Sequence, residues 1–495
     1  MTLSCRAPLE AILIACGLVL AGCTTLSPEA QTAALIARAE TAMGSAELKT
    51  LTVSGRGSGA SVGQAYAPGM AWPGLHLTAL SRSLNFETAS FREEYIRSRS
   101  EPLGGGAVPL MGTGEARGVV LARETYAWNV AGTATVSAPA ALSARVHDLW
   151  TSTPQGAIKA AARMGARAAV RRDFLRRWDT LTFDLPNQFS ATLVLEDTGL
   201  ISRIESTVPH AVLGDMPVVT QFLDYRPQAG LMLPSRIVQT QGGFAALDLK
   251  VTQVAANEEV EITIPDNVRA ATEVVTVDKV ADGVWFLSGG THNSVAVEQA
   301  GQIVLVELPL HEGWARVVLD AANKLVVGKR ALTVINTHHH FDHAGGLRVA
   351  AAEGATIFTS ALAQRYFESA FAQVQTRTPL ASTPSGRKAI FMAVESKAVL
   401  NDPIRPVEIH ELKDSIHARG LLVVWLPREQ LLIEADAYTP GAPGAPPPAV
   451  PNANHLNLVH NLDRLGLTPR LILPLHGRVV PAADLYAQVG RKPPP

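Results

Sequence analysis

The hydrophobic pattern of this chain changes near residue 270. Between residues 48 and 265, short runs of alternating apolar and polar residues are separated by Gly, Pro and Asn. This period of two predicts strands with one buried face, so we expect a mainly antiparallel β domain with one or two helices. The clearest strand-like runs lie at 189–195, 218–225 and 236–240. Ala-rich apolar positions, with Lys or Arg at every fourth position from 159 to 171, predict one helix over residues 153–178.

The second pattern covers residues 271–495, where apolar runs rich in Val, Ile and Leu alternate with helical patterns. The strand-like runs lie at 275–287, 302–308, 331–335, 407–409, 421–426, 431–435 and 471–473. The helical runs lie at 311–325, 345–353 and 360–374. Strands interleaved with helices predict a layered α/β domain. Residues 439–451 contain six prolines, so we expect a surface loop or lid there.

A linker and one helix are expected over residues 23–47. Ser27 is suited to the N-cap, Pro28 to the first helical position and Glu29 to the first turn. The helical pattern runs to Met43 and ends at Gly44. This helix precedes the first strand-like run.

The first 22 residues read as an export signal, because a basic residue is followed by an apolar stretch too short to span a bilayer. The chain has three cysteines, Cys5, Cys16 and Cys23. The sequence Leu20-Ala21-Gly22-Cys23 resembles the lipobox of bacterial lipoproteins. The resemblance implies a signal peptide over residues 1–22, acylation of Cys23, and a periplasm-facing lipoprotein of the outer membrane whose membrane contact is this lipid anchor alone. An ordinary cleaved signal is the alternative.

Composition narrows the classes of partner. Hydrophobic residues make up 47% of the 495 positions, which is enough for sizeable cores. The formal net charge is −1, which does not support binding to nucleic acid or to a strongly charged partner. We therefore expect a small-molecule substrate and no nucleic-acid partner.

One short run carries the chemistry of the C-terminal half. His338, His340, Asp342 and His343 stand within six residues, between a strand-like run and a helical one. A loop between a strand and a helix lets several side chains converge on one point. Imidazole nitrogens and a carboxylate suit Zn²⁺ or Fe. A metal-sticky surface tract is the alternative, but the ordered spacing disfavours it.

This run resembles the signature loop of the metallo-β-lactamase superfamily, and the resemblance extends over residues 273–480. Three further family positions follow in order, each beside a strand-like run: His417, Asp436 and His476. The resemblance implies an αββα sandwich in the C-terminal domain. It also implies one metal ion held by His338, His340 and His417, and a second held by Asp342, His343 and His476, with Asp436 bridging both.

The resemblance implies two Zn²⁺ ions per chain, with Fe or Mn as alternatives. Two dications about 3.5–4 Å apart lower the pKa of a shared water and prepare it for attack. Asp342 is the candidate catalytic residue, because its carboxylate can also take a proton from the water and pass it to the leaving group.

Several other residues near the motif carry weaker expectations. His292 and Tyr438 are candidate substrate-binding residues, although a structural role competes for each. His339 is expected to make a contact behind the ligands, and Phe341 to pack. Glu307 stands where the superfamily often has an aspartate that braces the metal loop. We expect His410 and His455 on the surface or in loops.

The resemblance favours hydrolysis of a small ester, lactone or thioester, as in the glyoxalase-II and lactonase branches. The β-lactamase branches lack a bridging aspartate at the position of Asp436, so β-lactam hydrolysis is disfavoured. Phosphodiester cleavage is also disfavoured, because no basic cluster lies near the motif. Two other classes stay open: a mononuclear-iron redox enzyme on the same fold, and a non-catalytic envelope lipoprotein whose β domain binds a ligand.

Overall fold

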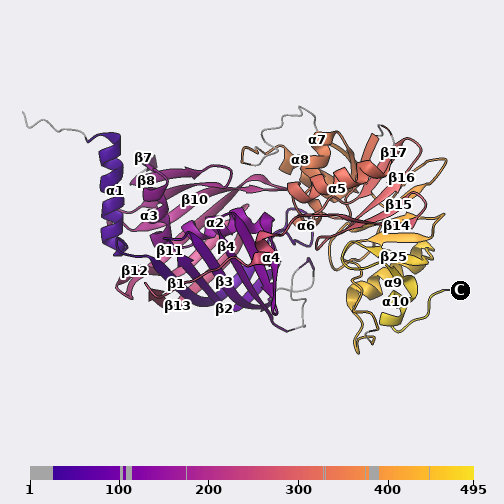
Figure 1. The fold of residues 1–495 in the computed structure, drawn as a ribbon, viewed down its shortest axis with the longest axis horizontal. Coiled ribbons are helices and arrows are strands. Elements are labelled where there is room, and N and C mark those ends of the chain that lie inside the picture. Colours follow the sequence, from indigo (N-terminus) through magenta and orange to yellow (C-terminus); the bar gives the residue numbers. More distant parts are fainter. Residues whose placement is uncertain are drawn as a thin grey trace, which may run out of the picture.

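The computed structural model describes residues 26–494 except 101–103, 107–113, 174–175, 327, 329–330, 374, 378–388 and 445. The expected signal peptide, residues 1–22, and Cys23 lie outside the described residues, and their roles stay predictions. Figure 1 shows two parts, a large N-terminal sheet and a C-terminal layered part, with the short helix α6 (Phe341–Ala344) where they meet.

The N-terminal helix has the caps expected from the sequence. Helix α1 (Pro28–Met43) begins after Ser27, whose side chain accepts a hydrogen bond from the Ala30 N–H at 3.2 Å. It ends at Gly44, which adopts the left-handed conformation with φ +67°. The helix packs against α3 (Pro154–Arg163) and the strand β7 (Arg167–Asp173).

The described N-terminal residues form one antiparallel sheet of 13 strands, in the order β6-β5-β4-β3-β2-β1-β13-β12-β11-β10-β9-β8-β7. Besides β7, the strands are β1 (Thr50–Ala60), β2 (Gly74–Asn85), β3 (Ser90–Arg99), β4 (Ala116–Arg123), β5 (Tyr126–Ala131), β6 (Ala134–Ser137), β8 (Arg176–Leu185), β9 (Phe189–Leu195), β10 (Ile201–His210), β11 (Gly214–Gln228), β12 (Leu231–Gln241) and β13 (Phe244–Ala256). The 3₁₀ helix η1 (Pro139–Ala141) and the helices α2 (Leu142–Thr151) and α4 (Asp266–Arg269) complete this part. One hydrophobic core joins α1, α2 and α3 to the sheet. The expected antiparallel β domain is therefore confirmed as a fold class.

The single helix predicted over residues 153–178 is wrong. Helix α3 ends at Arg163, Gly165 has φ +65°, and the chain then forms the antiparallel hairpin of β7 and β8. Basic residues every four positions fit one helix face, but four is also an even number, so they equally fit one face of a strand. Arg171 on β7 accordingly pairs with Glu205 at 2.7 Å.

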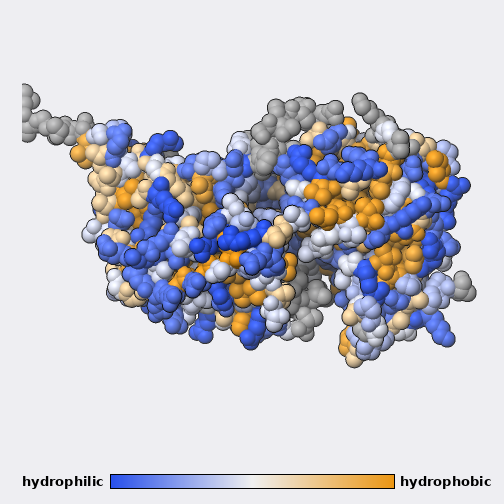
Figure 2. Space-filling view, viewed as in Figure 1, coloured by the Kyte–Doolittle hydropathy of each residue, from blue (hydrophilic) through white to orange (hydrophobic). Residues whose placement is uncertain are grey.

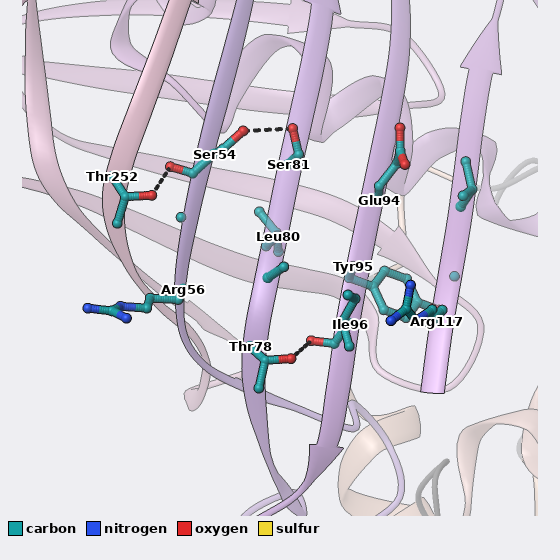
Figure 3. A pocket seen from close by; sticks show the side chains of 14 residues that line it. Ser54, Arg56, Thr78, Leu80, Ser81, Glu94, Tyr95, Ile96, Arg117 and Thr252 are labelled. Atoms are coloured by element: carbon teal, nitrogen blue, oxygen red, sulfur yellow. Dashed lines mark hydrogen bonds between the residues drawn. The ribbon is translucent and has the colours of Figure 1, made fainter. Parts of the chain in front are cut away.

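A pocket of about 740 Å³ lies on the N-terminal sheet over β1 to β4 and β13 (Figure 3). Its hydroxyl groups are engaged within the sheet: Ser54 Oγ lies 2.8 Å from Ser81 Oγ, and the Thr78 hydroxyl donates to the Ile96 carbonyl. None of the potential metal-ligand groups among the described residues includes a residue of this pocket.

The C-terminal part has the αββα layers that the resemblance implies (Figure 1). Its described residues form a seven-stranded sheet, β14 to β20 in order, and a six-stranded sheet, β21 to β26 in order. One core lies between the seven-stranded sheet and helices α5, α7 and α8, a second between the two sheets, and a third between the six-stranded sheet and helices α9 and α10. The expected fold class is confirmed.

The bounds of these elements follow the sequence pattern closely. The first sheet contains β14 (Thr276–Ala281), β15 (Val284–Ser288), β16 (Ser294–Glu298), β17 (Gln302–Val306), β18 (Ala331–Ile335), β19 (Thr356–Ser360) and β20 (Ile390–Val394). The second contains β21 (Lys397–Leu400), β22 (Val407–Glu411), β23 (Leu422–Leu426), β24 (Leu431–Glu434), β25 (Leu471–Pro474) and β26 (Val480–Pro481). The helices are α5 (Glu312–Leu325), α7 (Leu347–Glu353), α8 (Ala361–Phe371), α9 (Ala453–Leu465) and α10 (Ala482–Gln488), besides α6. The expected strand over 275–287 is a hairpin that turns at Gly283, whose φ is +68°.

The two parts are joined by a buried contact at the β10–β11 turn. Val212, which is fully buried, belongs to the core between the seven-stranded sheet and its helices. Its carbonyl accepts two hydrogen bonds from the Arg348 guanidinium on α7, at 3.0 and 3.2 Å. Nearby, the Thr376 N–H donates to Asp215 at 3.0 Å. This contact fixes the N-terminal sheet against the helix that follows the histidine-rich loop.

The surface is mixed in character. Figure 2 shows hydrophilic residues over both parts on this face, with apolar areas over the C-terminal part. In the described part of the chain, no helix has both the length and the hydrophobicity needed to cross a membrane.

Candidate metal centre

The histidine-rich loop lies where strand β18 ends, between the two parts of the molecule. Asn336, the first residue after β18, holds the start of the loop against β19. Its N–H donates to the Phe358 carbonyl, and its side chain accepts from the Thr359 hydroxyl at 3.0 Å. His338, His340 and His343 are at most 1% exposed. A loop fixed in this way can hold several imidazoles in a single arrangement.

The first cluster consists of His338, His340, His417 and Asp436. His338 Nε2 lies 3.0 Å from His340 Nδ1 and 3.3 Å from His417 Nε2. Asp436 Oδ2 lies 3.3 Å from His338 Nε2 and 3.1 Å from His417 Nε2. Four potential ligand atoms from three separate segments therefore face one point.

The second cluster consists of His292, Asp342, His343 and His476. His343 Nε2 lies 3.1 Å from His476 Nε2, and His292 Nε2 lies 3.3 Å from Asp342 Oδ2. The other nitrogen of His476, Nδ1, donates to the Thr291 carbonyl at 3.2 Å and so directs Nε2 into the cluster. His292, expected at the substrate, thus lies among the potential ligands.

Asp436 connects the two clusters. Its Oδ2 lies 2.8 Å from His343 Nε2, and its Oδ1 lies 3.3 Å from His476 Nε2, in addition to its contacts in the first cluster. The residue has φ +59°, a left-handed conformation that aspartate tolerates better than most residues. Buried Glu434 holds this turn by accepting the N–H groups of Ala437 and Tyr438 at 3.1 and 3.0 Å. The geometry suits Asp436 to a bridging position.

Glu307 braces both clusters from behind. This fully buried carboxylate accepts a hydrogen bond from His343 Nδ1 at 2.7 Å and another from the Thr337 hydroxyl. The Thr337 hydroxyl in turn lies 2.9 Å from His338 Nδ1. With their Nδ1 protons directed towards Glu307 and Thr337, His338 and His343 both direct Nε2 at the clusters, where a metal ion would take the place of any proton on it.

The donor set fits metal ions. Ligand atoms bound about 2.0–2.1 Å from a tetrahedral Zn²⁺ lie roughly 3.3 Å apart. The distances between facing atoms in the two clusters, 2.8–3.3 Å, are close to this value. Lone pairs directed at one another across such distances repel unless a cation lies between them. The residues present therefore fit two bound cations.

The surrounding charges also favour positive charge at the second cluster. Burial lowers the pKa of His343, but Glu307, Asp436 and Asp342 together outweigh burial and raise this pKa well above its usual value. Burial and the neighbouring imidazoles instead lower the pKa of His338 and of His340 well below the usual value. His338 and His340 thus present neutral imidazoles to the first cluster, the form that binds metal.

The segment that connects β1 and β2 of the N-terminal sheet reaches this centre, through the Gln64 side chain and the Ala65 backbone, which the sequence did not indicate. The Gln64 amide donates to Asp342 Oδ1 at 2.8 Å. The Ala65 carbonyl lies 2.9 Å from Nε2 of His339 and 2.9 Å from Nε2 of His340. Gln64 and Asp342 are 278 residues apart, and no local motif signals such a contact.

The remaining candidates lie outside the clusters. His339 contacts the Ala65 carbonyl behind the ligands, and Phe341 packs edge-on against His210 with ring centroids 4.5 Å apart. Tyr438 is 1% exposed in the core beneath α9, with its ring against His455, so it contacts neither cluster. The surface position expected for His410 and His455 is wrong. Both are buried, at 4% and 7% exposure, because β22 and α9 turn them towards the core.

His292 provides a test of the second cluster. Replacing His292 with Ala should weaken the binding of one of two metal ions by roughly 10- to 100-fold, the usual effect of removing a partner of a metal ligand. Binding at the first cluster should be unchanged, because His292 contacts Asp342 and not the first cluster. Metal retained after dialysis against chelators of graded strength measures both sites. Retention of both ions at wild-type affinity would show that His292 is not part of the centre.

Comparison with known proteins finds a matching family model and similar solved structures. The family model of the metallo-beta-lactamase superfamily matches residues 287–477. Among solved structures, the chain is similar to a metallo-beta-lactamase from Pontibacter korlensis, at 16% identity over 44% of this chain and 97% of that chain, with a TM-score of 0.34. A metallo-beta-lactamase from Hirschia baltica is similar at 18% identity over 44% of this chain and 96% of that chain, with a TM-score of 0.34. No curated protein matches the chain.

Proposed function

We propose that this chain, in which residues 287–477 form a metallo-β-lactamase superfamily domain, is a metal-dependent hydrolase with a binuclear zinc centre that cleaves small ester, lactone or thioester bonds. One observation carries the proposal: the ligand atoms of two clusters face one another across the shared carboxylate of Asp436. Such a pair of adjacent cation sites is typical of hydrolases that activate water.

The site residues would act as metal ligands, and one of these ligands, Asp342, would also carry a proton. His338, His340 and His417 would hold one Zn²⁺, and Asp342, His343 and His476 the other, with Asp436 between them. Bound zinc would polarise the substrate carbonyl and lower the pKa of water at the site.

Asp342 is suited to carry the proton. Burial alone would raise its pKa, but His343 and His292 bring this pKa well below its usual range, so the carboxylate is ionised. An ionised carboxylate beside the attacking water can accept its proton and deliver it to the leaving oxygen or sulfur. The site is therefore equipped for both halves of an acyl-transfer reaction to water.

The choice of an ester-type substrate rests on Asp436. This residue stands where the resemblance places a bridging aspartate in thioesterase and lactonase branches, and the C-terminal part contains no cysteine to replace it. The formal net charge of −1 does not support a strongly charged partner, so a small-molecule substrate stays the proposal.

The test is a substrate panel on the zinc-loaded protein from residue 24 onward, with lactone, thioester, simple ester, β-lactam and phosphodiester probes. We expect two zinc ions per chain and hydrolysis of one of the first three classes. Asp342→Asn should lower kcat by roughly 10²- to 10⁴-fold, the usual contribution of a general acid–base group. The matched control Asp320→Asn changes an exposed helix residue and should keep full activity.

The other two classes give different results. One iron ion per chain, with no hydrolysis of any probe, would support the mononuclear redox enzyme instead. Residual hydrolysis that is the same in Asp342→Asn and in the wild type would support a non-catalytic binding role.

A further inference from the structure

The segment 61–73, which connects β1 and β2 of the N-terminal sheet, lies against the metal centre. The Gly63 carbonyl accepts the Phe341 N–H at 3.3 Å, and the Tyr66 carbonyl accepts the Arg419 N–H at 2.7 Å. Phe341 lies between His340 of the first cluster and Asp342 of the second, and Arg419 lies two residues after His417 of the first cluster. The segment thus bridges two ligand-bearing loops of the other part of the chain.

The backbone of this segment fixes one ligand of the first cluster. His340 presents Nδ1 to His338 Nε2, and its remaining nitrogen, Nε2, lies 2.9 Å from the Ala65 carbonyl. A carbonyl only accepts hydrogen bonds, so the single proton of the neutral imidazole must lie on Nε2. Its lone pair is then on Nδ1 and directed at the cluster, as metal binding requires.

A side chain of the same segment fixes one ligand of the second cluster. The two carboxylate oxygens of Asp342 have different partners: Oδ1 accepts the Gln64 amide at 2.8 Å, and Oδ2 faces His292 at 3.3 Å. With Oδ1 held by Gln64, rotation of the carboxylate is restricted and Oδ2 stays directed at the second cluster. Gln64 therefore acts on the metal through Asp342.

Glycines allow this close approach. Gly63 has φ +79°, and a Cβ there would collide with the Phe341 ring. A Cβ on Gly106, in the β3–β4 connection, would collide with Oε1 of Gln64 and lie 3.1 Å from Cε1 of His340. Trp72 at the end of the segment is buried and packs edge-on against Phe341, with ring centroids 6.4 Å apart. Segment 61–73 is therefore packed between the β3–β4 connection and the histidine-rich loop, which restricts its position.

We propose that the N-terminal sheet takes part in metal binding. Its segment 63–66 fixes the ligand atoms of His340 and Asp342, and Gln64 is a positioning residue for the second metal ion. The proposal rests on the metal occupancy of the proposed function, but it is independent of which bond is hydrolysed. It gives the β domain a role in positioning the metal ligands that the superfamily domain supplies.

The test is a titration of the metal-free full chain with Co²⁺ alone, followed by the visible absorption of the bound ion. The wild type should bind two equivalents. In Gln64→Leu, the second equivalent should bind roughly 10- to 100-fold more weakly and with an altered spectrum, because outer partners of ligands have effects of this size. The first equivalent should bind as in the wild type, and the control Gln221→Leu, on an exposed position of β11, should change neither.

Gly106→Ala gives a second, independent route to the same contact, because the added methyl group displaces the Gln64 amide while leaving its side chain intact. We expect weaker binding of the second equivalent in this variant, and weaker binding of the first equivalent as well, because the methyl group also lies 3.1 Å from Cε1 of His340. Thermal unfolding of each metal-free variant shows that the chain is folded.

The outcomes separate the two proposals. Two equivalents in the wild type and identical titrations in Gln64→Leu would overturn this inference and leave the binuclear centre in place. Fewer than two equivalents in the wild type would overturn the binuclear centre and this inference with it. Unchanged binding of the second equivalent in Gly106→Ala would also contradict the inference, because the methyl group displaces the Gln64 amide.

Discussion

Replacing Asp436 with Asn should reduce the metal content from two ions per chain to one and lower kcat/KM by at least about 100-fold, the upper end of the loss caused by removing a mere partner of a ligand. The side chain keeps its volume, but the bridging negative charge is lost. Oδ2 of Asp436 lies 2.8–3.3 Å from three histidine nitrogens of the two clusters, and its amide substitute cannot satisfy all of them. Metal analysis and steady-state kinetics on the best substrate of the panel measure the two effects.

The control for this variant is Asp278→Asn, which changes an exposed residue of β14 and should keep two ions and full activity. Burial alone raises the pKa of Asp436, but His417 and His343 lower this pKa well below its usual value, so the native residue is charged. If Asp436→Asn kept two ions at wild-type affinity, the bridging role would be wrong, and the centre would consist of two separate sites.

The seven expected ligands lie together in the two clusters; four of them come from one short local pattern, and the other three from the family resemblance. His338, His340, Asp342 and His343 follow one strand directly, and parallel strand ends place such residues at a common edge. His417, Asp436 and His476 each stand beside another strand of the six-stranded sheet. The resemblance supplied their order, and the αββα layering explains why these loops meet.

The contribution of the N-terminal sheet could not be predicted in this way. Gln64 and Ala65 sit in a turn of ordinary composition, and their contacts span 274–278 residues of chain. A hydrogen bond to a backbone carbonyl cannot be predicted from residue type, because every residue has such a carbonyl. The packing of Val212 and Trp72 against the C-terminal part helps to place this turn at the centre.

The wrong helix over residues 153–178 has a different cause. The local pattern was compatible with both secondary structures, and long-range pairing decided between them. Arg171 finds Glu205 across the sheet, and the Ala168 N–H donates to the Thr32 hydroxyl of α1 at 3.0 Å. These partners are 34 and 136 residues away, so sequence periodicity alone does not contain the information.

Glu307 occupies the place where the resemblance led us to expect an aspartate, and its longer side chain reaches two ligands at once. It adopts φ +63°, which bends the chain after β17 and brings the carboxylate under the loop. His343 Nδ1 and the Thr337 hydroxyl both donate to it, and Thr337 continues the chain of hydrogen bonds to His338. One buried carboxylate thus sets the proton positions of a ligand in each cluster.

Replacing Glu307 with Gln should therefore weaken both metal sites, by roughly 10- to 100-fold each. The amide keeps the shape of the carboxylate, but only one of its two terminal atoms accepts a hydrogen bond. His343 Nδ1 and the Thr337 hydroxyl each need an acceptor. Whichever donor faces the amide NH₂ is left without an acceptor, which should lower the free energy of unfolding of the metal-free protein by about 1–3 kcal/mol. Co²⁺ titration and urea unfolding measure the two effects.

A control and a pattern of losses make this prediction specific. Glu395→Gln changes an exposed position and should leave stability and metal binding unaltered. Loss of affinity at the second cluster alone would show that the Thr337 branch does not orient His338, since His343 is the direct partner of Glu307. Equal weakening of both sites would instead distinguish Glu307 from Gln64. Replacement of Gln64 should weaken only the second ion, because its side chain holds Asp342 and contacts no ligand of the first cluster.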